Sequence, residues 1–396
     1  MIEKIRKYLK GDIIIWVVIF TLSLISILAV YSSTGTLAYK YRGGDTFYYF
    51  LKHGIFLIIS LAVIFLTHLI HYKYYSRLSQ LLLIISIPLL VFTLVLGVSY
   101  NQAARWITLP GLGFTIQSSD FAKLALIMYV ARLLSLKQDK IHDFNSTFVP
   151  VIIPVIIVCG LIFPANFSTA AILFVTCMVL MFIGRIRFRF IVLLVVTCLF
   201  LSLGFIGIAK LAGYEGRIET WTNRLESYVN KDKSELDNFQ VNQAKIAIVN
   251  GGLFGRGPGN SIQRNFLPHP YSDFIYAIII EEYGFVGGVV VLFLYLYLLF
   301  RAGVIVRKVD RTFPAFVAIG LAVSLVFQAI VNMGVAVNIF PVTGQTLPLV
   351  SMGGTSMLFS SISMGIILSI SRTLQLNEEE KLEMIALNEE ENENNN

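Results

Sequence analysis

Three carboxylates stand where a glycine-rich polar segment passes directly into a long apolar run. Asp273 lies at the boundary, and Glu281 and Glu282 follow within the apolar sequence. A charged side chain at membrane depth costs roughly 2.5–3.5 kcal/mol on insertion scales, so such groups are seldom kept for packing alone. The chemistry open to Asp273 is that of a general base at a membrane boundary. The alternative is a helix N-cap, and the sequence alone favours neither.

The spacing of these carboxylates predicts different roles for the two glutamates. If Asp273 and Glu281 lie on one helix, about 12 Å of rise and about 80° of rotation separate them. We therefore expect Glu281 to share the face of Asp273 and to support the same site, whereas Glu282 points toward another helix. The alternative for both glutamates is pairing with a neighbouring helix that fixes only the packing.

A second group of polar residues has the chemistry to bind an anion. Lys123 follows Asp120 by three residues, so on a helix the two side chains lie close enough to pair with each other. In the other interpretation, Lys123 acts with arginines around an anionic headgroup, since ammonium and guanidinium groups match phosphate oxygens. These arginines are Arg105, Arg224 and Arg256.

Two segments rich in glycine interrupt the apolar sequence. Gly251 to Gly259 lacks the GK[ST] ending of a nucleotide loop, which favours a tight loop that brings its backbone close to a substrate. Pro341 to Ser356 lies between two apolar runs. Non-helical backbone at membrane depth is tolerated only where it is buried in protein or lines a cavity. We expect a cavity wall there in preference to a simple hairpin.

The composition sets the class of protein. Of 396 residues, 56% are hydrophobic and only 14% are charged, which is too little charge to cover a soluble domain of this size. At about 20 residues per span, the apolar runs predict an all-α polytopic membrane protein with ten transmembrane helices. The predicted spans are 13–31, 47–69, 78–99, 119–136, 146–163, 168–184, 188–211, 274–300, 313–338 and 355–371.

The basic residues behind the net charge of +7 are distributed as in the loops of a membrane protein, and this distribution argues against nucleic-acid binding. Lys and Arg gather in alternate short connections, which predicts that both termini are cytoplasmic. The large loop 212–272, between helices 7 and 8, is then extracytoplasmic. We expect a transmembrane domain over 1–372 and an acidic, Asn-rich cytoplasmic tail over 373–396, disordered or briefly helical near Lys381 to Leu387.

Several short motifs are spread along the membrane region. They are Arg105-Trp106-Ile107, Gln117 with Ser119 and Phe121-Ala122-Lys123, Asn166 with Thr169, Arg224-Leu225, Gln240 to Gly259, Leu267-Pro268 with Asp273-Phe274-Ile275, Glu281-Glu282 with Gly284, and Pro341 to Ser356. Together they resemble the SEDS family (shape, elongation, division and sporulation), whose members include FtsW, RodA and SpoVE. Within the family, Pro341 to Ser356 and the acidic tail are more similar to the division member FtsW than to RodA.

Some positions depart from the family pattern, although the aspartate at 273 is unchanged. In the motif that is usually QPSE, and in the segment that precedes Asp273, five residue types differ. These are Ser118 for Pro, Asp120 for Glu, His269 for Glu, Tyr271 for His and Ser272 for Thr.

The resemblance implies a peptidoglycan glycosyltransferase that polymerises lipid II into glycan strands at the outer membrane face during septal wall synthesis. It implies inversion at the anomeric carbon, an undecaprenyl diphosphate leaving group, and a class B penicillin-binding protein (an FtsI-like transpeptidase) and other divisome proteins as partners. Asp273 is then the general base, supported by Asp120 and Glu281. The sequence requires no cofactor, and a divalent cation (Mg or Mn) with Asp273 as a ligand stays open. The residues implied to bind substrate or diphosphate are Arg105, Lys123, Arg224, Gln243, Arg256 and Ser351.

Three other functions are alternatives to this one. An elongation polymerase of the RodA kind differs from the division polymerase only in its partner and in where it acts in the cell. A lipid II flippase or transporter needs polar groups along the whole crossing path, whereas here they gather on the predicted outer side, and no convincing internal repeat is present. A scaffold for division proteins leaves Asp273 beside a glycine-rich loop without an explanation.

Overall fold

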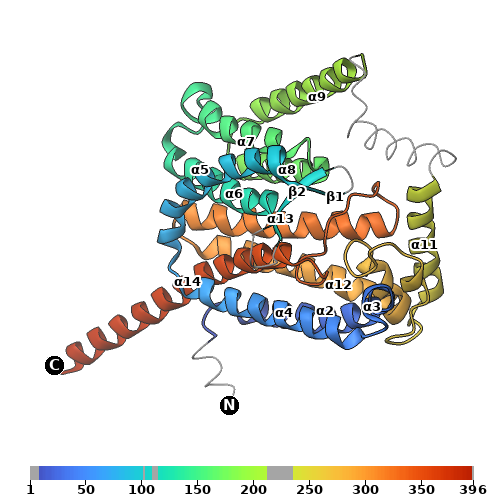
Figure 1. Ribbon diagram of the computed structural model, residues 1–396. Helices are drawn as coiled ribbons and strands as arrows, with labels where there is room; N and C mark the ends of the chain where they lie inside the picture. The colour runs from blue at the N-terminus through green and yellow to red at the C-terminus, as the bar shows by residue number, and fades with distance from the viewer. Residues whose placement is uncertain (1–8, 101–102, 109–114, 212–234, 395–396) are drawn as a thin grey trace.

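The structure is a computed structural model that describes residues 9–100, 103–108, 115–211 and 235–394. Most of the described chain is helical, because a helix satisfies its own backbone polar groups where no water is available. The long helices run side by side as one bundle (Figure 1). They are α2 (Ile13–Ser33), α4 (Thr46–Leu69), α5 (Tyr72–Leu96), α6 (Ser118–Leu136), α7 (Val149–Ile162), α8 (Phe167–Ile183), α9 (Phe188–Leu211), α12 (Ile275–Lys308), α13 (Thr312–Ala336) and α14 (Thr355–Asn394).

Each of the ten predicted spans coincides with one of these helices. In the described part of the chain, seven helices are long and apolar enough to cross a membrane, and the apolar stretches Phe167–Ile183 and Phe188–Phe200 are shorter. The chain is therefore a polytopic, all-α membrane protein. The number of ten spans stays a prediction.

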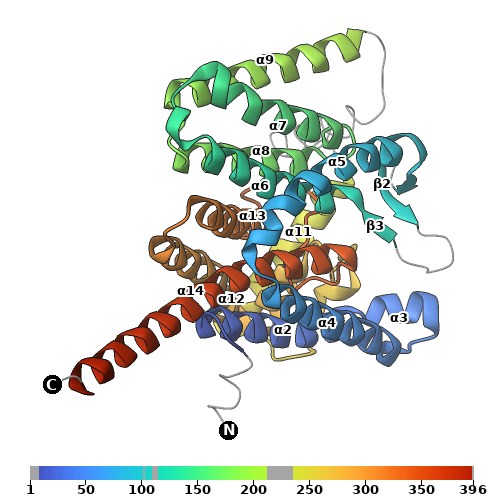
Figure 2. The same cartoon turned by 90° about the vertical axis from the view of Figure 1, so that its left-hand side faces the viewer.

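Helix α13 runs through the middle of the bundle and is buried over most of its length. Helices α6, α8, α12 and α14 pack around it, whereas α9 lies at one side (Figures 1 and 2). Close approach depends on small residues: a Cβ at Gly320 of α13 would crowd Leu180 and Ile127, which belong to α8 and α6. The site described below uses polar side chains of this central helix.

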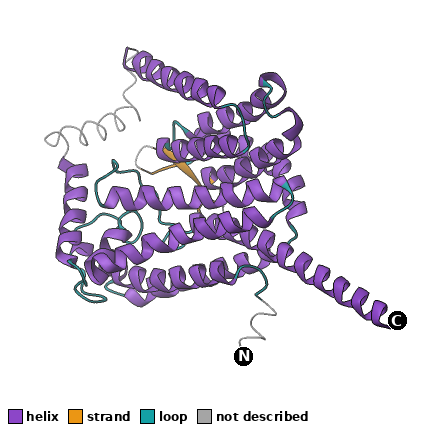
Figure 3. Cartoon of the chain, turned by 180° about the vertical axis from the view of Figure 1, so that it is seen from behind, coloured by secondary structure: helices purple, strands orange, loops and turns teal. Residues whose placement is uncertain are grey.

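Short elements cover the end of the bundle at which α12 and α14 begin, which we call the Asp273 end. A three-stranded antiparallel sheet lies there in the order β1–β2–β3 (orange in Figure 3). The described part of the predicted loop 212–272 opens with a helix, α11, that packs against α12. The short elements at this end are α3 (Gly35–Arg42), β1 (Val98–Tyr100), β2 (Ala103–Thr108), β3 (Thr115–Gln117), α11 (Glu235–Gly251) and η3 (Gln263–Asn265), whereas η1 (Gln138–Lys140) and η2 (Phe144–Phe148) follow the other end of α6.

The acidic tail differs from the expectation of disorder. Helix α14 continues without a break to Asn394 and projects past the bundle at the opposite end, the tail end (Figures 1 and 2). Two causes are visible. The tail is rich in Glu and Leu, which have high helix propensity. In addition, Lys10 Nζ pairs with Glu379 Oε2 at 2.8 Å and anchors the first turns of the extension.

Candidate functional site

Asp273 lies in the turn that precedes α12 and not on the helix itself. The N-cap position belongs to Phe274, which makes no side-chain capping bond, and the helix begins at Ile275. Asp273 is half-buried and accepts a hydrogen bond at Oδ1 from Ser272 Oγ at 2.9 Å. The prediction that Asp273 and Glu281 share one helix face is therefore wrong, because the turn directs Asp273 independently of the helical repeat.

The non-helical segment 337–354, between α13 and α14, holds this turn in place. Met352 N donates to Tyr271 O at 2.9 Å, and Ser351 Oγ donates to Ser272 O at 2.7 Å. Both bonds reach backbone carbonyls that directly precede Asp273. The predicted departure from helix between the two spans is confirmed, and Ser351 joins the Asp273 site through the backbone.

The same segment stores backbone strain close to the carboxylate. Leu349 is fully enclosed and has a φ of 62°, a left-handed conformation that costs a residue other than glycine roughly 1–2 kcal/mol. Ser351 Oγ accepts a hydrogen bond from Leu347 N at 2.8 Å across this bend. Gly344 also has a positive φ, and a Cβ there would lie 3.5 Å from Asp273 Oδ2. The loop is thus shaped around the aspartate.

Two buried amides on α13, which the sequence analysis missed, fasten the loop to the central helix. Asn332 Nδ2 donates to Asp273 O at 3.0 Å and to Gln345 O at 2.6 Å. One turn earlier, Gln328 Nε2 donates to Thr346 O at 2.9 Å. The signal was present in the sequence as two amides four residues apart in an apolar run, since polar side chains in a membrane helix face protein partners.

Among the described residues, Lys123 is connected to the site through Gln328. Its Nζ lies 3.4 Å from Asp120 Oδ1, which confirms the predicted i,i+3 contact, and donates to Gln328 Oε1 at 2.6 Å. Asp120 Oδ2 is buried and has no hydrogen-bond partner among the described residues. Lys123 is thus held inside the bundle by two partners and is not splayed toward an open headgroup site.

Removing the Asn332 amide tests whether this network holds the Asp273 turn. In Asn332→Ala, the carbonyls of Asp273 and Gln345 both lose a buried donor, which we expect to cost about 1–3 kcal/mol of folding free energy. Thermal unfolding in detergent measures the loss. Ser324→Ala, on the same helix and also buried, is the control, because Ser324 Oγ takes part in none of the described hydrogen bonds. Equal unfolding temperatures for the two variants would contradict the assignment.

Helix α12 is broken at Gly284, and the glycine-rich loop repairs the break. Gly284 has φ 73° and ψ −175°, which no helix accommodates. Arg256 N donates to Glu281 O at 3.0 Å and Gly257 N to Glu282 O at 2.9 Å, while Gly252 O accepts from the N–H of the residue after Gly284 at 2.8 Å. The loop is therefore tight, as predicted, but these backbone amides bond α12 instead of a substrate.

Glu281 holds the segment that follows the glycine loop. Its side chain is completely enclosed and accepts hydrogen bonds from Ile262 N at 3.1 Å, Gln263 N at 3.2 Å and the hydroxyl of Ser261. Buried carboxylates need such donors, since an unsatisfied charge at this depth is costly. Glu281 therefore supports the chain leading to Asp273 rather than facing the site.

Glu282 contacts another helix, as predicted. Its Oε1 accepts from the hydroxyl of Ser32, the residue before the last of α2, and from Ser261 N at 3.4 Å. Arg264 Nη1 donates to both oxygens of Ser32, at 3.0 and 3.1 Å, and brings a positive charge to the same place. The two adjacent glutamates of α12 thus bind the segment that follows the glycine loop, and Glu282 also joins α12 to α2.

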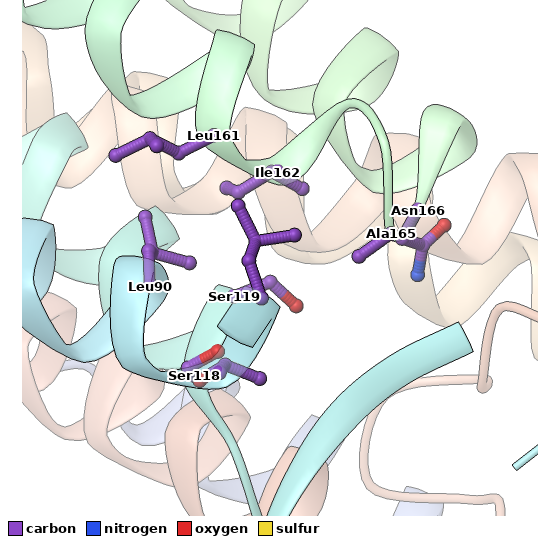
Figure 4. Close-up of a pocket in the computed structure, with 9 residues that line it drawn as sticks. Leu90, Ser118, Ser119, Leu161, Ile162, Ala165 and Asn166 are labelled. Carbon is purple, nitrogen blue, oxygen red and sulfur yellow. The ribbon is translucent and has the colours of Figure 1, made fainter. Parts of the chain in front are cut away.

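A cavity of about 330 Å³ is lined by the end of segment 337–354, by α4 and by the start of α14, and Asp273 is not among its lining residues. Met352 and Tyr271 line it, and Lys52 of α4 brings a cation to it. This volume falls in the range of ligand pockets, and the predicted cavity wall is confirmed. A second cavity, between α5, α6 and the turn before α8, holds only about 10 Å³ beside Ser119 (Figure 4), which is too small for a substrate.

The structure assembles only part of the predicted binding set. Ser351 lies at the Asp273 turn, and Lys123 is connected to it through α13. Gln243 lies on α11, and Arg256 is exposed on the glycine loop. Arg105 belongs to β2 but its side chain is outside the description, and Arg224 falls outside the described residues.

These observations define a polytopic helical membrane protein with a carboxylate fixed in a turn at one end of the bundle, two residues after a tyrosine that lines a cavity. The chain belongs to the FtsW/RodA/SpoVE family, because the family model described as "Cell cycle protein" matches residues 12–376. It is 34% identical over 379 residues to stage V sporulation protein E of Bacillus subtilis (strain 168), covering 92% of this chain and 98% of that protein. It is 32% identical over 384 residues to the probable peptidoglycan glycosyltransferase FtsW of Trichlorobacter lovleyi, covering 95% and 98%.

Solved structures support the fold. A chain from a structure described as "Structural coordination of polymerization and crosslinking by a peptidoglycan synthase complex" matches with a TM-score of 0.67 at 23% identity, covering 92% of this chain and 98% of that chain. The rod shape determining protein RodA of Thermus thermophilus matches with a TM-score of 0.63 at 24% identity, covering 91% and 97%. The bundle is therefore a RodA-like fold.

Proposed function

We propose that this protein is a peptidoglycan glycosyltransferase that polymerises lipid II into glycan strands. The observation that carries the proposal is the placement of Asp273, half-buried in a turn that segment 337–354 holds by hydrogen bonds and whose Tyr271 lines the cavity of about 330 Å³. The names of curated relatives that align over nearly the whole chain support the same activity. The similarity of this chain to relatives named FtsW favours a role in division over one in elongation.

In the proposed reaction, Asp273 takes the proton from the 4-hydroxyl of the acceptor sugar. The acceptor oxygen then attacks the anomeric carbon of the donor, the bond to undecaprenyl diphosphate breaks, and the configuration inverts. The segment 337–354 positions the base through Ser351 and Asn332. We assign diphosphate binding to Arg105, Lys123, Arg224, Gln243 and Arg256, with Lys123 requiring a rearrangement of its bond to Gln328.

A divalent cation fits this site only together with the substrate. In the described part of the chain no three His, Cys, Asp or Glu side chains form a metal-binding group. Mg²⁺ is commonly held by one or two carboxylates plus substrate phosphates, and Asp273 with a diphosphate meets that pattern. When bound, the cation would neutralise charge on the leaving diphosphate.

The same proposal implies on which side of the membrane the protein acts and with which partners. With both termini in the cytoplasm, the Asp273 end faces outward, where lipid II and the nascent glycan meet. A class B penicillin-binding protein and other divisome proteins are the proposed partners, at the division septum. One chain of the synthase complex named above has a fold like this one, which supports the proposal of a partner.

Two assays with purified protein separate a polymerase from a transporter. Lipid II in detergent micelles leaves nothing to transport, so glycan strands formed there by the chain with its partner would support the polymerase. Lipid II enclosed in the inner leaflet of liposomes reports crossing. Movement across the liposome membrane without strands in either assay would replace the proposal with a flippase.

A further inference from the structure

Four basic side chains from three distant segments converge at the tail end of the bundle. His71 and Lys73 lie at the turn between α4 and α5, Arg311 precedes α13, and Arg372 belongs to α14. Arg372 Nη1 donates to Leu69 O at 2.8 Å, which fixes this part of α14 against the turn. We call these four residues the cationic cluster.

The charges of the cluster act on one another. Burial lowers the pKa of His71, and the charges of Lys73, Arg311 and Arg372 lower it further. His71 is therefore neutral at pH 7, and the cluster keeps three cations within electrostatic reach of one imidazole. Like charges brought together in this way repel each other unless an anion lies among them.

No protein carboxylate supplies that anion in the part of the chain that the structure describes. No ion pair at this end of the described chain includes a member of the cluster, and Asp310, next to Arg311 in the chain, is exposed and belongs to none of these pairs. The pairs are Lys10–Glu379 (2.8 Å), Lys308–Glu378 (3.5 Å) and Arg301–Asp12.

We place the cluster at the depth of lipid headgroups because it lies between two candidate membrane spans, Thr46–Leu69 and Tyr72–Leu96. It marks the place where α4 ends and α5 begins, and α5 opens with Tyr72, Tyr74 and Tyr75. Tyr74 is 66% exposed, and tyrosines are enriched at the membrane–water interface. Basic pockets between helices at this level suit phospholipid phosphates. We propose that the cationic cluster binds a phosphate group, that of an anionic phospholipid headgroup.

Native mass spectrometry of the delipidated full-length protein tests this proposal with defined lipids. The probes are dioleoylphosphatidylglycerol, dioleoylphosphatidylcholine of the same chain length, and inorganic phosphate as a competitor. The variant is Lys73→Gln with Arg311→Gln, since both side chains are exposed and take part in none of the described side-chain contacts. The matched control is Lys140→Gln with Arg187→Gln, which removes the same two residue types from exposed positions in other connections at this end.

We expect the wild type and the control to bind phosphatidylglycerol in preference to phosphatidylcholine. The Lys73/Arg311 variant should bind phosphatidylglycerol roughly tenfold more weakly, because each Lys or Arg near an anionic headgroup adds to the attraction. Equal losses in both double variants would show diffuse attraction to the basic face and would overturn the site, as would no loss in either. Displacement of the lipid by millimolar inorganic phosphate would assign the site to a soluble phosphate compound and overturn the lipid as its source.

Discussion

Replacing Asp273 by asparagine should lower the rate of lipid II polymerisation by about 10²–10⁴-fold, the usual contribution of a positioned general base. Asparagine keeps the size of the side chain and can still accept the hydrogen bond from Ser272 Oγ. The bond from Asn332 reaches the backbone oxygen and is unaffected. The variant should therefore fold and bind lipid II normally, so the loss should appear in the turnover rate and not in binding.

The control for Asp273→Asn is Asp310→Asn. This change removes the same charge from an exposed residue in the connection between α12 and α13, at the tail end. It should leave polymerisation within twofold of the wild-type rate. An Asp273→Asn variant that polymerises as fast as Asp310→Asn would remove the proton-transfer role and leave Asp273 a structural residue of the turn.

The substitution Gly255→Ala should destabilise the protein by more than about 3 kcal/mol, a large effect for one methyl group. A Cβ at Gly255 would overlap the backbone carbonyl of Glu282 and approach Gly284 N, where α12 is broken. Backbone atoms cannot give way as a flexible side chain can, so the loop would separate from α12. The yield of monodisperse protein and its unfolding temperature measure the effect.

Gly259→Ala separates this clash from the general strain of a positive φ. Gly255 and Gly259 have φ of 81° and 78°, but a Cβ at Gly259 would meet nothing within 4 Å. Strain alone predicts a loss of roughly 1–2 kcal/mol at Gly259. If both alanine variants unfold at the same temperature, the glycine loop is not the element that closes the break in α12.

The sequence alone could predict the helices and the polar segments between them, because long apolar runs and polar interruptions are local signals. The departure from helix before α14 and the contact between Asp120 and Lys123 follow from such signals and are confirmed. The direction of Glu282 toward α2 followed from helical periodicity, which holds for the helix up to Gly284.

What the sequence could not provide depends on contacts between distant segments. The helical repeat placed Asp273 and Glu281 on one face, but bonds from Ser351 and Asn332 hold Asp273 in a turn outside the helix. The insertion of the glycine loop at the break in α12 joins residues some thirty positions apart. Gln328 is visible in the sequence as one of two amides in an apolar run, yet its partners are evident only in the structure, where α6 and the loop lie beside α13.

The most direct test of the central claim is to follow diphosphate release and glycan formation together, from lipid II in detergent. The purified protein would be assayed with the proposed penicillin-binding partner after a β-lactam has blocked the transpeptidase of that partner. Polymerisation with Asp273 as base predicts one undecaprenyl diphosphate released for each new glycosidic bond by the wild type, and neither product from Asp273→Asn on the same time scale. Equal amounts of both products from wild type and variant would contradict the account.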